Sequence, residues 1–288
     1  MNPTPEFDLL SMLSVGAGPG NDDRAGRSAD FAWVLDGATD LIDTPLVGQR
    51  SDAEWLADFA HSWLTTHAAQ QPPDRCLRDI LTELTHATAD AFSRQQRRAP
   101  SARFEIPSAA ALIARRSPTG ITYISVGDCT MLATTADGTS RFGTDAHDAG
   151  DQWLETVIRQ HRARTPEHTA EPLRTALIPD LKSARDRMNQ PGGYGVLSIS
   201  EPPDAFVVHC QIDLPKGTRV LLATDGLMRL IDVFARYDDT GLMTAIADRG
   251  LPELLSELRR IEADDEACIR YPRAKTSDDA TGLYLSLC

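Results

Sequence analysis

The chain has 288 residues, of which 41% are hydrophobic and 25% charged, so its composition is that of a globular protein and not of a disordered one. Its formal net charge of −13 argues against a nucleic-acid partner, because phosphate backbones are bound through lysine and arginine. The five cysteines are odd in number and include no Cys-x-x-Cys pair, so neither a disulfide framework nor a zinc site is predicted.

The first residues carry neither the basic segment nor the apolar stretch of a signal peptide. No run approaches the roughly 18 apolar residues that a membrane span needs. We therefore expect a cytoplasmic protein with no membrane partner.

Short apolar runs predict the first strand and the two helices that follow it. Residues 31–35 form a run of buried-strand character that ends at Asp36 and Gly37. Hydrophobic residues then recur at helical spacing over residues 52–69 and again over residues 75–95, which predicts two amphipathic helices. Pro72 and Pro73 separate them.

The second half of the chain adds three strands and one helix. Strands are predicted at residues 121–126, 219–223 and 282–287, and a helix begins at Leu251 with Pro252 in its first turn. Residues 143–195 are polar and rich in arginine, so we expect an inserted lobe there. This order of elements suits an α+β fold in which a sheet-based core carries helices on its faces, and we expect one domain over residues 1–288.

Acidic residues stand where these strands end. Three strands run directly into Asp36-Gly37, Gly127-Asp128 and Asp225-Gly226, and the fourth is preceded by Ser277-Asp278-Asp279. A carboxylate at the end of a buried strand is held rigidly, and an adjacent glycine allows a sharp turn that exposes a carbonyl oxygen. Several such ends together predict a site for Mg²⁺ or Mn²⁺, although any single Asp-Gly pair is also an ordinary turn.

Five segments, in this order, resemble the motifs of the metal-dependent protein phosphatase family, type 2C. The resemblance spans about residues 12–288. The matching segments are Asn21-Asp22-Asp23-Arg24, Val34-Leu35-Asp36-Gly37, Ser125-Val126-Gly127-Asp128-Cys129, Leu222-Ala223-Thr224-Asp225-Gly226-Leu227 and Ser277-Asp278-Asp279-Ala280-Thr281.

The resemblance implies a fold, a cofactor and a reaction. The fold would be two packed antiparallel sheets flanked by helices, with residues 143–195 as a flap beside the cleft. Two ions of Mn²⁺ or Mg²⁺ would activate a water that attacks the phosphate ester, with Asp36 bridging the ions and Asp225 also catalytic. The metal ligands implied are Asp22, Asp36, the Gly37 carbonyl, Asp128, Asp225 and Asp278.

The chain departs from the family pattern at several positions. Gly18 stands where the family usually has an arginine that grips the phosphate, so Arg24 and Arg27 become the candidate substrate-binding residues, with solvated ion pairs as the alternative. Ala38 replaces a histidine found in eukaryotic members. Arg229 replaces an aspartate of a third-metal site, where its guanidinium would replace that ion or exclude it. The shorter Asp22 would contact metal directly, through water or not at all.

Three functions remain open at this stage. The first is a phosphatase for phosphoserine or phosphothreonine on proteins, and the second is a phosphatase for a small phosphorylated metabolite. The second is motivated by Gly18 and by the unusual Ala38-Thr39-Asp40 segment after the metal motif. The third is a weakly active or inactive family member that serves as a binding module, which Arg229 and Asp22 motivate and the intact aspartates oppose.

Overall fold

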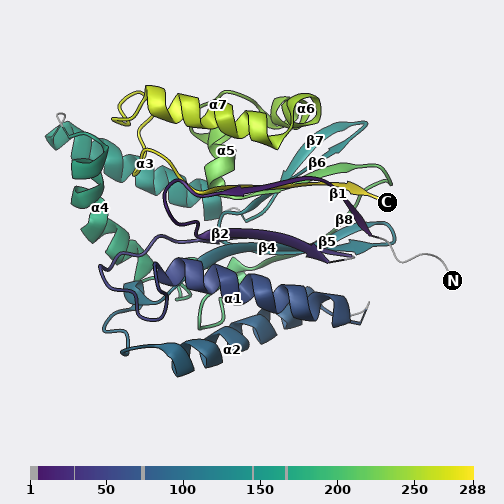
Figure 1. The fold of residues 1–288 in the computed structure, drawn as a ribbon, viewed down its shortest axis with the longest axis horizontal. Helices are drawn as coiled ribbons and strands as arrows, with labels where there is room; N and C mark the ends of the chain where they lie inside the picture. The colour runs from purple at the N-terminus through teal and green to yellow at the C-terminus, as the bar shows by residue number, and fades with distance from the viewer. Residues whose placement is uncertain (1–5, 29, 73–74, 145, 166–167) are drawn as a thin grey trace.

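Two antiparallel sheets lie face to face in the computed structural model, which describes residues 6–28, 30–72, 75–144, 146–165 and 168–288. Within these ranges each sheet has five strands, and helices cover its outer face (Figure 1). The expected α+β class and its layering are therefore confirmed.

One sheet carries the first helical layer. Its outer face is covered by α1 (Asp52–His67) and α2 (Leu77–Gln95), which pack on Trp33 and Ile113 through Leu64 and Leu84. The strand order is β2 (Asp23–Ser28), β3 (Phe31–Gly37), β4 (Ala109–Ser117), β5 (Gly120–Val126) and β8 (Val208–Asp213). Because β3 is covered on both faces, its residues 31–35 are all buried and its sequence is continuously apolar.

The other sheet carries the second helical layer. Its order is β1 (Phe7–Val15), β10 (Ala280–Leu287), β9 (Arg219–Ala223), β6 (Thr130–Thr135) and β7 (Gly138–Phe142). Its outer face is covered by α5 (Asp225–Asp232), α6 (Asp239–Arg249) and α7 (Leu251–Asp264). Between the two sheets, residues such as Val34, Leu112, Leu222 and Leu285 form the central core.

The lobe expected at residues 143–195 contains α3 (Ala146–Arg164) and α4 (Ala170–Arg185), which lie together at one end of the sandwich (Figure 1). Ile158, Leu173 and Leu177 form a small apolar core between them. Arg185 donates a hydrogen bond to the Thr39 carbonyl at 2.8 Å, which ties the end of α4 to the loop after β3. That this lobe acts as a flap stays a prediction.

The predicted strands and helices are confirmed as β3, β5, β9, β10, α1, α2 and α7. The remaining elements were not predicted, including the apolar strand β4. Strand β2 reads DRAGRS, and α5 begins at an Asp-Gly pair that resembles a turn. Short 3₁₀ turns occur at Ala68–Gln70, Arg103–Glu105 and Asp204–Phe206. Within the described ranges, no helix is both long and apolar enough to span a bilayer.

Candidate active site

Strand ends from both sheets bring acidic side chains together at one end of the sandwich. Asp36 ends β3 and lies opposite Asp23 at the start of β2, while Asp225 begins α5 directly after β9. The two sheets are joined here, because the Thr224 hydroxyl donates to Asp23 Oδ2 at 2.7 Å and the Asp225 amide lies 3.4 Å from Asp36 Oδ2. The predicted convergence of Asp36 and Asp225 is therefore present in the structure.

Asp36 is the centre of this negative charge. Burial raises the pKa of its carboxyl group well above the usual range, and the charges of Asp23, Asp225 and Asp128 raise it further. The pKa of Asp225 is also raised, chiefly by burial and then by Asp278. Carboxyl groups this close oppose one another's ionisation, so a cation among them would be strongly favoured.

The cap of α1 orients Asp22. The Ser51 hydroxyl accepts a hydrogen bond from the Glu54 amide as the N-cap of α1 and donates one to Asp22 Oδ1 at 2.6 Å. The Gly37 amide donates to the Asp22 carbonyl, and a Cβ at Gly37 would lie only 2.5 Å from that oxygen. Asp22 and Gly37 are therefore adjacent, and the backbone approach requires glycine.

Asp279 anchors the segment that carries Asp22. Its two carboxylate oxygens accept from the Ala17 amide at 2.7 Å and from the Asp22 amide at 2.6 Å. Its carbonyl packs against α5 so tightly that a Cβ at Gly226 would lie 1.8 Å away. Prediction from sequence did not assign Asp279 or Asp23 to the site, although both stand in the acidic pairs that were singled out.

Asp278 faces two cations. Its Oδ2 accepts from Arg229 Nη2 at 2.6 Å, and its Oδ1 pairs with the ammonium group of Lys275. Burial opposes ionisation of Asp278, but Lys275 and then Arg229 outweigh it, so the pKa of this carboxyl lies below its ordinary value. Lys275 is a further residue that prediction from sequence missed, because no motif marks it.

Asp128 joins the acidic cluster from the end of β5. Gly127 before it has a φ of 75°, and a Cβ there would lie 2.5 Å from that of Ala110, so the turn into Asp128 requires glycine. The Thr144 hydroxyl donates to the Gly127 carbonyl and fixes this turn. The charge of Asp128 contributes to the raised pKa of Asp36, which places it in the same cluster.

The two candidate substrate-binding arginines are tied to the scaffold. Arg24 pairs with Asp58 of α1 at 2.6 Å and donates to the carbonyls of Asn21 and Asp23, each also at 2.6 Å. Arg27 lies four residues further along β2 than Asp23 and donates to the Phe7 carbonyl at 3.4 Å. The Arg24 side chain is 22% exposed in these contacts, and a role for either residue in phosphate binding stays a prediction.

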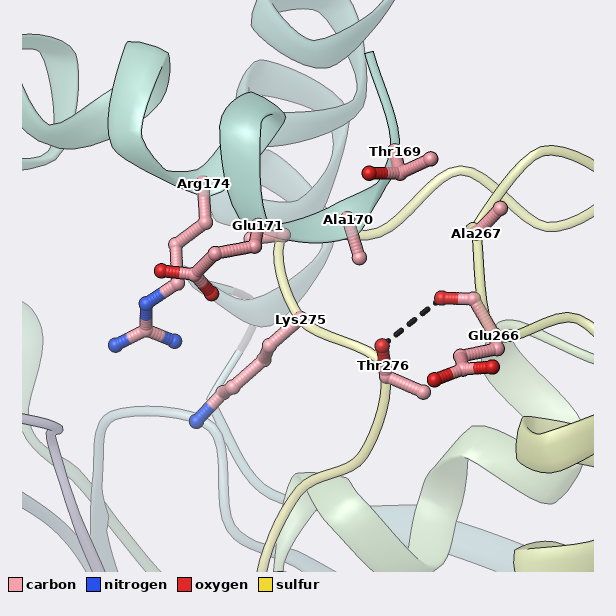
Figure 2. Close-up of a pocket in the computed structure, with 9 residues that line it drawn as sticks. Thr169, Ala170, Glu171, Arg174, Glu266, Ala267, Lys275 and Thr276 are labelled. Atoms are coloured by element: carbon pink, nitrogen blue, oxygen red, sulfur yellow. Dashed lines mark hydrogen bonds between the residues drawn. The ribbon is translucent and has the colours of Figure 1, made fainter.

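A cavity opens beside the acidic cluster. It has a volume of about 540 Å³ and lies between the first turns of α4 and residues 266–276 (Figure 2). Lys275 lines this cavity and also pairs with Asp278, so this side chain lies between the cavity and the cluster. The side chains of Arg174 and Lys275 extend toward the same side of the cavity in Figure 2.

The donor set fits a hard divalent cation by its charge and chemistry. The converging side chains offer carboxylate oxygens, which Mg²⁺ and Mn²⁺ prefer, and the raised pKa of Asp36 shows that its negative charge is poorly compensated. In the described ranges, no three acidic, histidine or cysteine side chains already surround a point where an ion would sit.

Comparisons with known proteins agree with this fold. Residues 17–258 match the family model described as protein phosphatase 2C. The serine/threonine phosphatase PstP/Ppp of Mycobacterium tuberculosis superposes with a TM-score of 0.58 at 14% identity, covering 98% of this chain and 99% of that one. The serine/threonine phosphatase of S. agalactiae gives 0.59 at 10% identity, covering 98% and 100%.

Two further solved structures with the same fold contain bound ligands. The PstP catalytic domain in complex with two manganese ions superposes with a TM-score of 0.55 at 13% identity, with 99% of each chain covered. The phosphatase MsPP from Mycobacterium smegmatis, in complex with cacodylate, gives 0.55 at 17% identity over 97% of this chain and 99% of that one. No curated protein sequence matches significantly.

Proposed function

The chain belongs to the protein phosphatase 2C family, and on that premise we propose that it hydrolyses phosphoserine or phosphothreonine on proteins with the help of divalent metal ions. Family membership supports a phosphoric monoester hydrolase. The observation that carries the metal dependence is the buried group of mutually repelling carboxylates centred on Asp36, whose pKa is raised first by burial and then by Asp23 and Asp225.

Different residues of the cluster would bind the metal ions and orient water. Asp36, Asp225 and the Gly37 carbonyl would hold Mn²⁺ or Mg²⁺, which supplies an acidified water and neutralises phosphoryl oxygens. The Ser51 hydroxyl donates to the carboxylate of Asp22, and Asp279 accepts from the Asp22 amide. Held in this way, Asp22 would orient a water beside the cluster. Asp128 would add a further carboxylate on the same side.

The cavity beside the cluster would receive the substrate. Arg174 supplies positive charge to its wall and would contact the substrate, while Glu171 and Glu266 line the same wall and Lys275 pairs with Asp278. A phosphorylated segment of a protein would lie along this opening, between α4 and residues 266–276, with its phosphate toward Asp36. The lobe formed by α3 and α4 would act as the flap that borders it.

A small phosphorylated metabolite is the second candidate substrate. The cavity volume of about 540 Å³ falls in the range that small-molecule sites occupy. A site that encloses its substrate gains transition-state binding from the parts that do not react, so it would select sharply among metabolites.

Metal dependence is tested with the purified full chain and p-nitrophenyl phosphate. Hydrolysis is expected with added Mn²⁺ or Mg²⁺ and is expected to stop with EDTA, because the protein ligands do not generate a nucleophile by themselves. A folded protein that shows no turnover with any divalent cation would support an inactive member that acts as a binding module.

Substrate class is tested by comparing kcat/KM for phosphopeptides with kcat/KM for a panel of phosphorylated metabolites under saturating Mn²⁺. We expect phosphopeptides to be preferred at least tenfold, and Arg174→Ala to raise KM for them while leaving p-nitrophenyl phosphate turnover nearly unchanged. Arg94→Ala, on the exposed side of α2, is the matched control. A tenfold preference for one metabolite would assign the chain to the second candidate.

A further inference from the structure

Asp278 is clamped between two positive side chains that come from different parts of the chain. Arg229 lies one turn after Asp225 on α5 and is only 7% exposed, and its Nη2 lies 2.6 Å from Asp278 Oδ2. Lys275 approaches from the loop before β10 and pairs with Asp278 Oδ1, while also donating to the Thr39 hydroxyl at 3.1 Å. Each oxygen of this carboxylate therefore already has a cationic partner.

A second layer of contacts fixes this arrangement. Behind Arg229 lies Glu262 of α7, which is 1% exposed, with 3.4 Å between Nη1 and Oε1. Arg259 pairs with the other oxygen of Glu262 at 2.7 Å and donates to the Asp278 carbonyl at 2.7 Å. Arg229 therefore neutralises two buried carboxylates at once. A shift of its guanidinium away from Asp278 would also disturb the ion pair that it forms with Glu262.

The acidic cluster is therefore electrostatically uneven. In the described part of the chain, no lysine or arginine forms an ion pair with Asp23 or Asp36, whereas Asp278 has two such partners. Asp225 is intermediate between Asp36 and Asp278. Burial and the charge of Asp278 disfavour its ionised form, whereas Arg229 and Lys275 favour it. An added cation would therefore be attracted most strongly near Asp36 and least strongly near Asp278.

We propose that Arg229 and Lys275 are built-in counter-ions of Asp278, so that this chain binds one divalent ion tightly at the Asp36 side and a second ion at least tenfold more weakly. The inference rests on the metal dependence proposed above. It assigns to two side chains of this protein the charge that a second ion would otherwise supply beside Asp278.

The test measures Mn²⁺ binding to the metal-free full chain, without substrate, by calorimetry and by the electron paramagnetic resonance signal of free Mn²⁺. The wild type is expected to show one tight site and a weaker one. Lys275→Gln removes the charge and keeps a polar side chain that is one atom shorter, so it should strengthen the weaker site about tenfold. Lys216→Gln, in the exposed turn between β8 and β9, is the matched control and should change neither site.

Arg229→Gln should act in the same direction as Lys275→Gln, and the latter carries the test if the arginine variant fails to fold, because the Lys275 side chain is 29% exposed. Two wild-type sites with affinities within threefold of each other would overturn the inference while leaving metal-dependent catalysis intact. Unchanged binding in a folded Lys275→Gln variant would also overturn it. No Mn²⁺ binding in any variant would overturn both this inference and the proposed metal dependence.

Discussion

At the scale of single residues, the site combines carboxylates that have different electrostatic surroundings. Asp36 is surrounded by other acids and its pKa is raised, with burial as the largest cause, whereas Asp278 is paired with Lys275 and Arg229 and its pKa is lowered. Asp23 is buried and accepts from the Thr224 hydroxyl. Under the proposed function, one residue type would bind a cation at Asp36 and pair with basic side chains at Asp278.

The substitutions Asp36→Asn and Asp225→Asn are each expected to lower turnover a hundredfold or more, on the order of 3 kcal/mol of transition-state stabilisation. Because both carboxyls have raised pKa values in the folded protein, their charges oppose folding near neutral pH when no metal is bound. The free energy of unfolding in EDTA, measured with urea, should therefore not fall. Wild-type turnover in either variant would show that the site is elsewhere; Asp137→Asn, in the exposed turn after β6, is the control.

At the scale of elements, short polar contacts hold helices and loops against the sheets. Asp52 at the start of α1 accepts from the amides of Leu46, Val47 and Gly48 at 2.6–2.8 Å, which fixes the loop that leads from the site to the helix. On the opposite layer, Glu257 of α7 accepts from Arg236 and the Tyr237 hydroxyl, which precede α6, and from Arg249, the last residue of α6. These contacts set how the helices sit on their sheet.

Glu257 gives the outer helices a pH-dependent stability. Burial opposes its ionisation, but Arg236, Tyr237 and Arg249 outweigh that cost and lower its pKa from 4.5 to about 2. Its contribution to the free energy of unfolding is therefore complete above about pH 4.5 and is lost as pH falls toward 2.

Glu257→Gln should accordingly lower stability near pH 7 by about 2 kcal/mol, which is typical of hydrogen bonds to charged groups. Urea denaturation of both proteins at several pH values measures the difference, which should shrink steadily below pH 4.5. A difference that stays constant down to pH 2.5 would contradict this account and assign the effect to packing. Asp248→Asn, exposed on α6, is the control.

At the scale of the whole molecule, the acidic cluster is built from strand ends of both sheets, and Arg185 of α4 donates to the Thr39 carbonyl in the loop after β3. Its charge adds to a chain that is already strongly negative, with 42 acidic residues against 29 basic ones. Cations bound at the cluster would therefore join elements of both sheets and reduce the repulsion between them. Metal binding and folding should be coupled.

Saturating Mn²⁺ is expected to raise the melting temperature of the metal-free protein, because a ligand at 100 times its Kd stabilises the folded state by about 2.7 kcal/mol. Differential scanning calorimetry measures this shift, and NaCl of matched ionic strength controls for general screening. Asp36→Asn should abolish most of the shift, since it removes the carboxylate at the centre of the cluster. An equal shift in NaCl alone would indicate that only non-specific screening is involved.

Local sequence patterns predicted two interior strands of each sheet (β3, β5, β9 and β10), the helices α1, α2 and α7, and the acidic residues at the strand ends, including Asp36 and Asp225. These features depend on local patterns, because continuous burial and helical periodicity are written in neighbouring residues. Tertiary structure alone decided how the acids are partnered. Asp279 holds the amide of Asp22 across 257 residues, and Arg229 reaches Asp278 across 49. Such contacts depend on how the two sheets pack. No local pattern therefore reveals which aspartate is paired with a basic side chain and which has no such partner.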